Sequence, residues 1–237
     1  MSDHHISSAF DRDLEGIQSL LVKMGGLVEA AITDGIRSLE DRDADLAERV
    51  RAGDKAIDAL EEQIIEEATR VIALRAPVSK DLRVLMSVIK SAAALERCGD
   101  YAKNIAKRTS VLVDQRPLDG AAVSLRRMGR AVQGMLKDTL DAFVARDAAL
   151  AGDVLQRDQE VDQMYNALFR EFLTHMLEDP RNITPCMHLH FIAKNVERMG
   201  DLVTNIAEQV VYLTTGEMPE EKRPKGDVTA FSTYDPS

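Results

Sequence analysis

Two stretches of this chain, LERCGDYAKNIA at residues 95–106 and VERMGDLVTNIA at residues 196–207, share seven identities in twelve positions. Each stretch carries a Glu and an Asp four residues apart, with a glycine directly before the Asp. On a helix these carboxylates lie one turn apart on the same face, where like charges repel, and a helical glycine costs about 1 kcal/mol relative to alanine. Because both penalties occur twice in the same pattern, the two stretches predict a duplicated helical unit.

The similarity continues toward the N-terminal side of both stretches, where the offset between matching residues is 104 instead of 101. Matching pairs include Leu21 and Leu125, Gly25 and Gly129, Asp54 and Asp158, and Asp58 and Asp162. The change of offset indicates that the second copy is three residues shorter between Asp162 and Val196, because connections between helices tolerate such changes. The sequence therefore indicates an internal duplication of a unit of about a hundred residues.

Each copy predicts three long helices. In the first copy, apolar residues recur at the helical period across residues 10–39, which indicates a stripe that faces a core. Asp43 is a suitable N-cap for a second helix over residues 43–74, and Ser79 is a suitable N-cap for a third helix over residues 79–113.

In the second copy, we expect helices at residues 121–146, 147–178 and 185–214. Thr184 is the expected cap of the last of these helices, and Pro185 suits its first position, where the missing N–H group is not needed.

The expected fold is therefore all-α, with two tandem, similar three-helix bundles. The first bundle covers residues 1–115 and the second covers residues 121–215. The segment DQRPLDG, residues 114–120, is the candidate hinge between them. Residues 216–237 lack hydrophobic periodicity and predict a mobile tail.

Composition limits the class of protein. Aromatic residues make up only 4% of the chain, which favours helices over sheets. A formal net charge of −10 repels nucleic acid, so we expect no nucleic-acid partner. The chain has no apolar run long enough to span a membrane and no signal-peptide pattern, which predicts a cytoplasmic location. Cys98 and Cys186 have neither disulfide nor zinc-ligand spacing and are expected to be packing residues.

Four acidic pairs with i,i+4 spacing occupy equivalent places on the second and third predicted helices of both copies. Random placement of the 40 acidic residues would produce about seven such pairs, so one pair alone carries no weight. Recurrence does carry weight, because neighbouring acids such as Glu61 and Glu66 have no acidic match in the second copy. The candidate metal-binding residues are Asp54, Asp58, Glu96 and Asp100 in the first copy and Asp158, Asp162, Glu197 and Asp201 in the second.

If the second and third helices of each bundle lie side by side, these carboxylates face one another, and a cation would remove their repulsion. Oxygen ligands without His or Cys favour hard ions such as Mg, Mn or Ca, and iron or zinc are accepted less characteristically. The acidic stripes are extended by Asn104, Asn205, Glu62 and Asn166. Gly99 and Gly200 are expected to be small so that a neighbouring helix or a hydrated ion can approach.

The chain contains neither a G-x-x-x-x-G-K-[ST] loop nor a G-x-S-x-G motif. A metal-dependent phosphohydrolase that uses the same carboxylates is one alternative, since paired hard ions can activate water. It is disfavoured because Arg97 and Arg198 are the only cations at matching positions beside both clusters, and they lie about 100° around the helix from the neighbouring Glu. The other alternative is a purely structural scaffold whose acids are solvated or paired with these arginines.

Through its motifs DKAID at 54–58, ERCGD at 96–100, DQEVD at 158–162 and ERMGD at 197–201, the chain resembles the PhoU family of phosphate transport accessory proteins. The resemblance covers nearly the whole chain up to residue 214. It implies a cytoplasmic protein, peripheral to the inner membrane only through its partners, and often dimeric. It also implies that the eight acidic residues bind metal ions, with Mg, Mn, Fe or Zn as candidates.

For function, the resemblance implies a non-enzymatic regulator of phosphate uptake and phosphate-starvation signalling. Members of the family link a phosphate ABC transporter, through its ATPase subunit, to a sensor histidine kinase. They keep the starvation response off while phosphate is plentiful. We therefore expect a negative regulator that has these two proteins as partners and that assembles as a homodimer.

Overall fold

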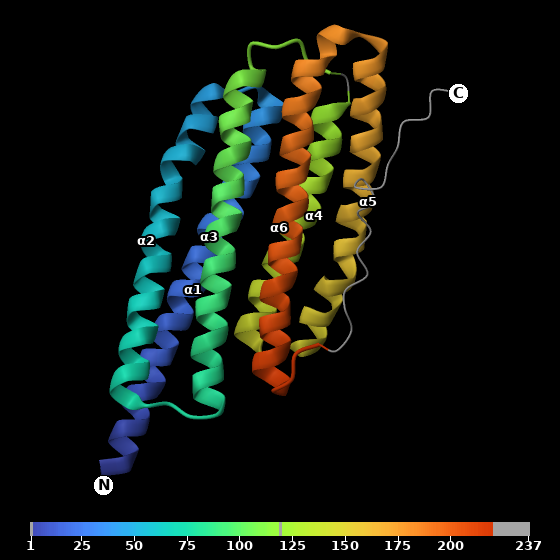
Figure 1. Cartoon of the computed structure of the whole chain (residues 1–237). Helices are drawn as coiled ribbons and strands as arrows, with labels where there is room; N and C mark the ends of the chain where they lie inside the picture. Colours follow the sequence, from blue (N-terminus) through green and yellow to red (C-terminus); the bar gives the residue numbers. More distant parts are fainter. Residues whose placement is uncertain (1, 119, 220–237) are drawn as a thin grey trace.

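The computed structural model describes residues 2–118 and 120–219 and consists there of long helices (Figure 1). The elements are α1 (Ser2–Asp41), α2 (Ala44–Arg75), α3 (Lys80–Leu112), α4 (Ala121–Ala145), α5 (Ala148–Glu178), a short 3-10 helix η1 (Pro180–Asn182) and α6 (Ile183–Thr215). The expected all-α fold is confirmed. The expected tail falls mainly on residues 220–237, which lie outside the described residues.

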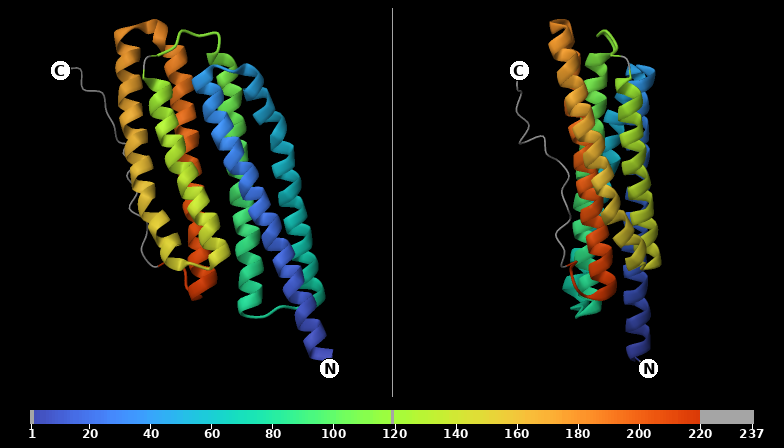
Figure 2. Two further views of the ribbon diagram at one scale, coloured as in Figure 1. Left: turned by 180° about the vertical axis from the view of Figure 1, so that it is seen from behind. Right: turned by 90° about the vertical axis from the view of Figure 1, so that its right-hand side faces the viewer.

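The helices form two groups of three, α1–α3 and α4–α6, and within each group every helix packs against the other two. The groups are joined along two seams, where α3 packs against α6 and α1 packs against α4. Figure 1 shows α3 and α6 side by side between α2 and α5, and the view from behind in Figure 2 shows α1 beside α4. The buried apolar side chains of both groups form one continuous core.

The seam between α1 and α4 follows the sequence repeat. A Cβ atom added to Gly25 would lie 2.5 Å from Leu140 Cδ1, and one added to Gly129 would lie 2.8 Å from Ile36 Cγ1. Each helix therefore places a branched side chain over the glycine of the other helix. These two repeated glycines allow the antiparallel helices to approach closely, which a side chain at either position would prevent.

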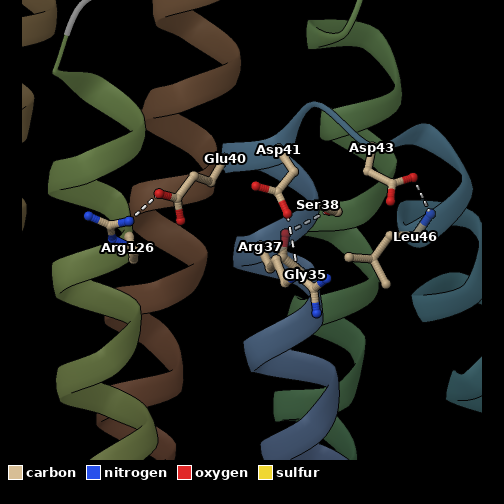
Figure 3. Close-up of polar contacts among 8 residues, drawn as sticks. All are labelled: Gly35, Arg37, Ser38, Glu40, Asp41, Asp43, Leu46 and Arg126. Atoms are coloured by element: carbon tan, nitrogen blue, oxygen red, sulfur yellow. Dashed lines mark hydrogen bonds and ion pairs between the residues drawn. The ribbon is translucent and has the colours of Figure 1, made fainter.

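The start of the second helix in each copy is capped as its sequence suggests. Asp43 Oδ1 accepts a hydrogen bond of 2.8 Å from Leu46 N, which confirms the predicted cap of α2 (Figure 3). The matching residue Asp147 accepts bonds of 2.9 Å and 3.0 Å from the backbone N–H groups of Ala149 and Leu150 at the start of α5. Each bond satisfies an amide that has no partner inside its helix.

Of the two other predicted caps, Ser79 is in the N-cap position but lacks the capping bond, and the cap at Thr184 is wrong. Ser79 precedes α3, but its side chain makes no capping hydrogen bond, because its backbone adopts φ 53° and ψ −112° instead of the extended conformation that a cap requires. Thr184 and Pro185 lie inside the first turn of α6, which begins at Ile183 because η1 leads directly into it. Pro185 is tolerated there because the first amides of a helix have no helical partner.

The connection between the two groups is tied to the end of α1. The guanidinium of Arg42 donates hydrogen bonds to the carbonyl oxygens of Val113 and Gln115, the latter at 2.7 Å. These bonds hold the start of the connection against the end of α1, and the hinge at residues 114–120 stays a prediction. Cys98 and Cys186 are buried and free, as packing cysteines should be. Among the described residues, no helix has the length and apolarity needed to cross a bilayer.

Candidate functional site

The first acidic cluster (Asp54, Asp58, Glu96 and Asp100) lies where α2 packs against α3. Asp54 is 4% exposed, although it is an ionisable residue on a helix surface. A Cβ atom at Gly99 of α3 would lie 3.0 Å from Ile57 Cδ1 and 3.5 Å from Asp54 Oδ1. Gly99 thus lets α2 approach α3 at the acidic pair, which is one of the two reasons expected for this glycine.

A lysine bridges the carboxylates of this cluster. The Lys103 ammonium group donates a hydrogen bond to Asp54 Oδ2 and lies 3.4 Å from Asp100 Oδ1. Asp54 Oδ1 is buried, and it has no hydrogen-bond partner in the described part of the chain. The cluster therefore contains one positive group, the Lys103 ammonium, and one buried acceptor without a hydrogen bond, Asp54 Oδ1.

Burial and the neighbouring negative charges raise the pKa values of two carboxylates in the cluster. The pKa of Glu96 is raised to about 7, first by burial and then by the negative charges of Asp100, Glu61, Asp58 and Asp54. Burial and then the charge of Asp54 also raise the pKa of Asp58, while Lys103 lowers it in part. The structure thus brings all four predicted residues of the first copy into one electrostatic unit.

The second acidic cluster (Asp158, Asp162, Glu197 and Asp201) lies between α5 and α6 and is more deeply buried. Asp158, Asp162 and Glu197 are all buried. A Cβ atom at Gly200 would lie 3.0 Å from Asp158 Oδ1, so this glycine repeats the role of Gly99. Lys194 Nζ donates a hydrogen bond of 2.9 Å to Glu197 Oε1, and it also lies 4.7 Å from the centre of the Tyr165 ring.

The two clusters obtain their nearby cations from different positions. Lys103 matches Thr204 in the second copy, whereas Lys194 matches Ala93 in the first. Asp54 accepts a hydrogen bond from Lys103, and Glu197 accepts one from Lys194. Arg198 instead lies over the ring of Tyr101, 5.9 Å from its centre, on the seam between α3 and α6.

Reasoning from the repeat missed two residues that act on the first cluster, Glu61 and Lys103. Glu61 contributes to the raised pKa of Glu96, although its lack of an acidic match in the second copy suggested an ordinary surface residue. Lys103 lies three residues after Asp100, and this i,i+3 spacing is the signal that could have identified it. Of the residues that extend the stripes, Asn166 is buried, whereas Glu62, Asn104 and Asn205 are exposed.

The donor atoms suit a cation that prefers oxygen ligands. The first cluster offers carboxylate oxygens only, including the unused buried acceptor of Asp54. Within residues 2–118 and 120–219, however, no three His, Cys, Asp or Glu side chains are arranged as a ready metal site. In the first cluster the Lys103 ammonium lies where it contacts two of the four carboxylates. Metal binding at the eight acidic residues therefore stays a prediction.

The chain matches the PhoU domain family twice, at residues 21–109 and 125–210. It is 46% identical over 228 residues to the phosphate-specific transport system accessory protein PhoU homolog of Caulobacter vibrioides, covering 96% of this chain and 99% of that protein. The corresponding homolog of Rhizobium meliloti is 44% identical over 230 residues, covering 97% of both chains.

Two crystal structures have the same fold. PhoU from Pseudomonas aeruginosa superposes with a TM-score of 0.84 at 41% identity, covering 88% of this chain and 100% of that one. The phosphate transport system regulatory protein PhoU from Streptococcus pneumoniae superposes with a TM-score of 0.82 at 31% identity, covering 90% and 100%. Each family match contains one of the two acidic clusters.

Proposed function

This chain belongs to the PhoU family, and on that basis we propose that it is a negative regulator of phosphate uptake and of phosphate-starvation signalling. The relatives named above are described as accessory and regulatory proteins of phosphate transport, and this chain acts in the same way and not as an enzyme. The observation that carries the proposal is that the similarity to these relatives spans nearly the whole chain and both copies of the repeat.

In this role the protein acts in the cytoplasm and links two membrane-associated partners, the ATPase subunit of a phosphate ABC transporter and a sensor histidine kinase. The positions of the acidic clusters, where α2 packs against α3 and where α5 packs against α6, support such docking. These four helices lie along one broad side of the molecule, with α1 and α4 behind them (Figures 1 and 2). Assembly as a homodimer would present two such sides.

We further propose that the two acidic clusters bind divalent or trivalent metal ions such as Mg, Mn, Fe or Zn. Asp54, Asp58, Glu96 and Asp100 would hold ions in the first copy, and the matching residues of the second cluster would hold them in the second. The raised pKa of Glu96 supports this role, because crowded carboxylates gain most from a positive charge. Bound cations would relieve that repulsion and order the surface to which partners dock.

Metal analysis of the purified full-length protein tests the metal proposal. The variant Glu96→Ala/Asp100→Ala/Glu197→Ala/Asp201→Ala is expected to lose its bound metal. A control removes four exposed acids outside the clusters, namely Glu48, Glu66, Asp141 and Glu178. The control should retain the metal content of the natural protein. Equal metal content in the two variants would contradict metal binding at the clusters.

Affinity capture from detergent-solubilised membranes tests the regulatory proposal separately. The natural protein is expected to retain the transporter ATPase and the sensor kinase, and the four-residue cluster variant is expected to retain less of both. Recovery of neither partner by the natural protein would contradict the regulatory role. Recovery that is unchanged in the cluster variant would favour a scaffold whose acids are only solvated.

A further inference from the structure

A cavity of about 150 Å³ lies between α1 and α4, two helices that carry none of the eight acidic site residues. Its floor is apolar and includes Ile32 and Ile36. Its rim is polar and consists of Thr33, Arg37 and Glu40 on α1 and of Arg126, Arg130 and Gln133 on α4. Figure 2 shows these two helices side by side in the view from behind. Three of the six rim residues are therefore arginines.

The spacing of the rim residues explains why they share one cavity. On each helix they are four and then three residues apart, which places them on one face. Arg126 of α4 forms an ion pair with Glu40 of α1 across the seam (Figure 3). Because Ile36 also packs over Gly129, the antiparallel register places Arg37 and Arg130 at nearly the same level on opposite walls. Both arginines thus line the same cavity.

The positive charge of the cavity is only partly compensated. The three arginines share the rim with one carboxylate, that of Glu40. A second carboxylate, that of Glu29, lies beside the rim and accepts a hydrogen bond of 3.2 Å from Gln133. Arg37 also lies 3.3 Å from Asp41, but the two side chains are 65% and 54% exposed, and such pairs contribute little. A site with excess positive charge is unusual in a chain whose formal net charge is −10. An anion between the walls would remove the repulsion between the arginines.

The repeat supplies an internal comparison. The seam packs in the same way at its other end, where Leu140 lies over Gly25. The positions that match the six rim residues there are Lys137, Asp141, Val144, Val22, Gly26 and Glu29. This set contains one lysine and two carboxylates. Helix packing is satisfied at both ends, so packing alone does not account for three arginines at one of them.

We propose that this arginine cavity binds a small tetrahedral oxyanion of the class of inorganic phosphate. Arginine offers five N–H donors in a planar fork that matches phosphate oxygens in pairs. Arg126, oriented by Glu40, keeps donors free, and Arg37 and Arg130 supply the opposing walls. The volume equals that of about five water molecules, which suits a small ion and is below the roughly 300 Å³ of sites for larger ligands.

This site needs neither a bound metal ion nor a protein partner, so it stands independently of the function proposed above. Calorimetric titration of inorganic phosphate into the full-length protein, with EDTA present and ionic strength held constant, should give saturable binding to one site. Arg37→Gln/Arg130→Gln should weaken binding at least about tenfold, since hydrogen bonds to charged groups are lost. Sulfate, which has the same shape, should compete.

The matched control, Arg51→Gln/Arg127→Gln, removes the same charge from exposed positions outside the cavity and should bind phosphate like the natural protein. Gln133→Glu keeps all three arginines and adds a negative charge to the rim, so it should also weaken binding. It provides a second test if the arginine variant does not fold.

Several results would overturn the proposal. One is the absence of saturable phosphate binding. An equal loss of phosphate affinity in the arginine variant and in its control would also overturn it, as would unchanged phosphate affinity in Gln133→Glu. Tighter binding of a nucleoside monophosphate than of inorganic phosphate would contradict the size argument, because it would show that the site binds a larger phosphate ester.

Discussion

Replacing Gly25 by alanine tests whether close approach along the seam between α1 and α4 explains the repeated glycines. Gly25 and Gly26 are neighbours on α1, but only Gly25 faces α4. A Cβ atom at Gly25 would lie 2.5 Å, 2.7 Å and 3.2 Å from three side-chain carbons of Leu140, whereas a Cβ atom at Gly26 would have no neighbour within 4 Å. The two substitutions therefore differ only in what the new methyl group meets.

The expected magnitudes follow from this difference. Gly26→Ala should stabilise the protein by about 0.5–1 kcal/mol, because alanine is the better helix former. Gly25→Ala gains the same amount but must displace the buried side chain of Leu140, and overpacking a core costs about 1–3 kcal/mol. The free energies of unfolding of the two variants should thus differ by about 1–3 kcal/mol, with Gly25→Ala the less stable.

Urea unfolding followed by circular dichroism measures this difference, and equal slopes in the two variants would show that the unfolded states are comparable. A difference of 1 kcal/mol corresponds to about 2–4 °C in melting temperature for a chain of this length. Gly129→Ala, the matching change in the second copy, should behave like Gly25→Ala because Ile36 covers it. If Gly25→Ala stabilised the protein as much as Gly26→Ala does, the account of the seam would be refuted.

Three further predictions concern the acidic clusters and the helix ends. Lys103→Met removes the ammonium that bridges two carboxylates, so it should raise the affinity of the first cluster for Mn²⁺ in calorimetric titration; unchanged affinity would show that the lysine does not compete. The folded-state pKa of Glu96 is about 7, above the ordinary value of 4.5, so its stabilising contribution is present below pH 4.5 and is lost as pH rises to 7. Glu96→Gln should therefore flatten the decline of stability across this window in urea unfolding with EDTA, and an unaltered decline would contradict the assignment. Asp43→Ala and Asp147→Ala should each destabilise the protein by about 1 kcal/mol, whereas Ser79→Ala, which loses no capping bond, should leave the melting temperature nearly unchanged.

Much of the fold could be predicted from local patterns. Apolar periodicity located all six long helices, because a stripe at 3.6 residues per turn is a property of each segment alone. The cap at Asp43 was predictable because it depends only on that residue and on the amide of Leu46 three positions later. The caps at Ser79 and Thr184 were not, because their roles depend on the path of the chain through the turns, where η1 and a left-handed backbone conformation intervene.

The candidate site was predictable in part. Matching positions in the two copies identified the acidic residues of both clusters, and the structure brings the four of the first copy together. The same comparison left Glu61 out of the first cluster, because its counterpart in the second copy is not an acid but the buried Tyr165 beside Lys194. A repeat reveals what two copies share, whereas Glu61 and Lys103 belong to the features in which they differ.

By itself, the sequence determined that the chain is helical and duplicated and which acids lie on one helix face, since spacing within a helix depends only on its geometry. Only the tertiary structure decided which faces meet. It placed Lys103 between Asp54 and Asp100, set branched side chains over Gly25 and Gly129, and gathered three arginines around one cavity. The physical reason is that packing between helices is set by the shapes of side chains far apart in the chain, and charges that share a site interact according to that packing.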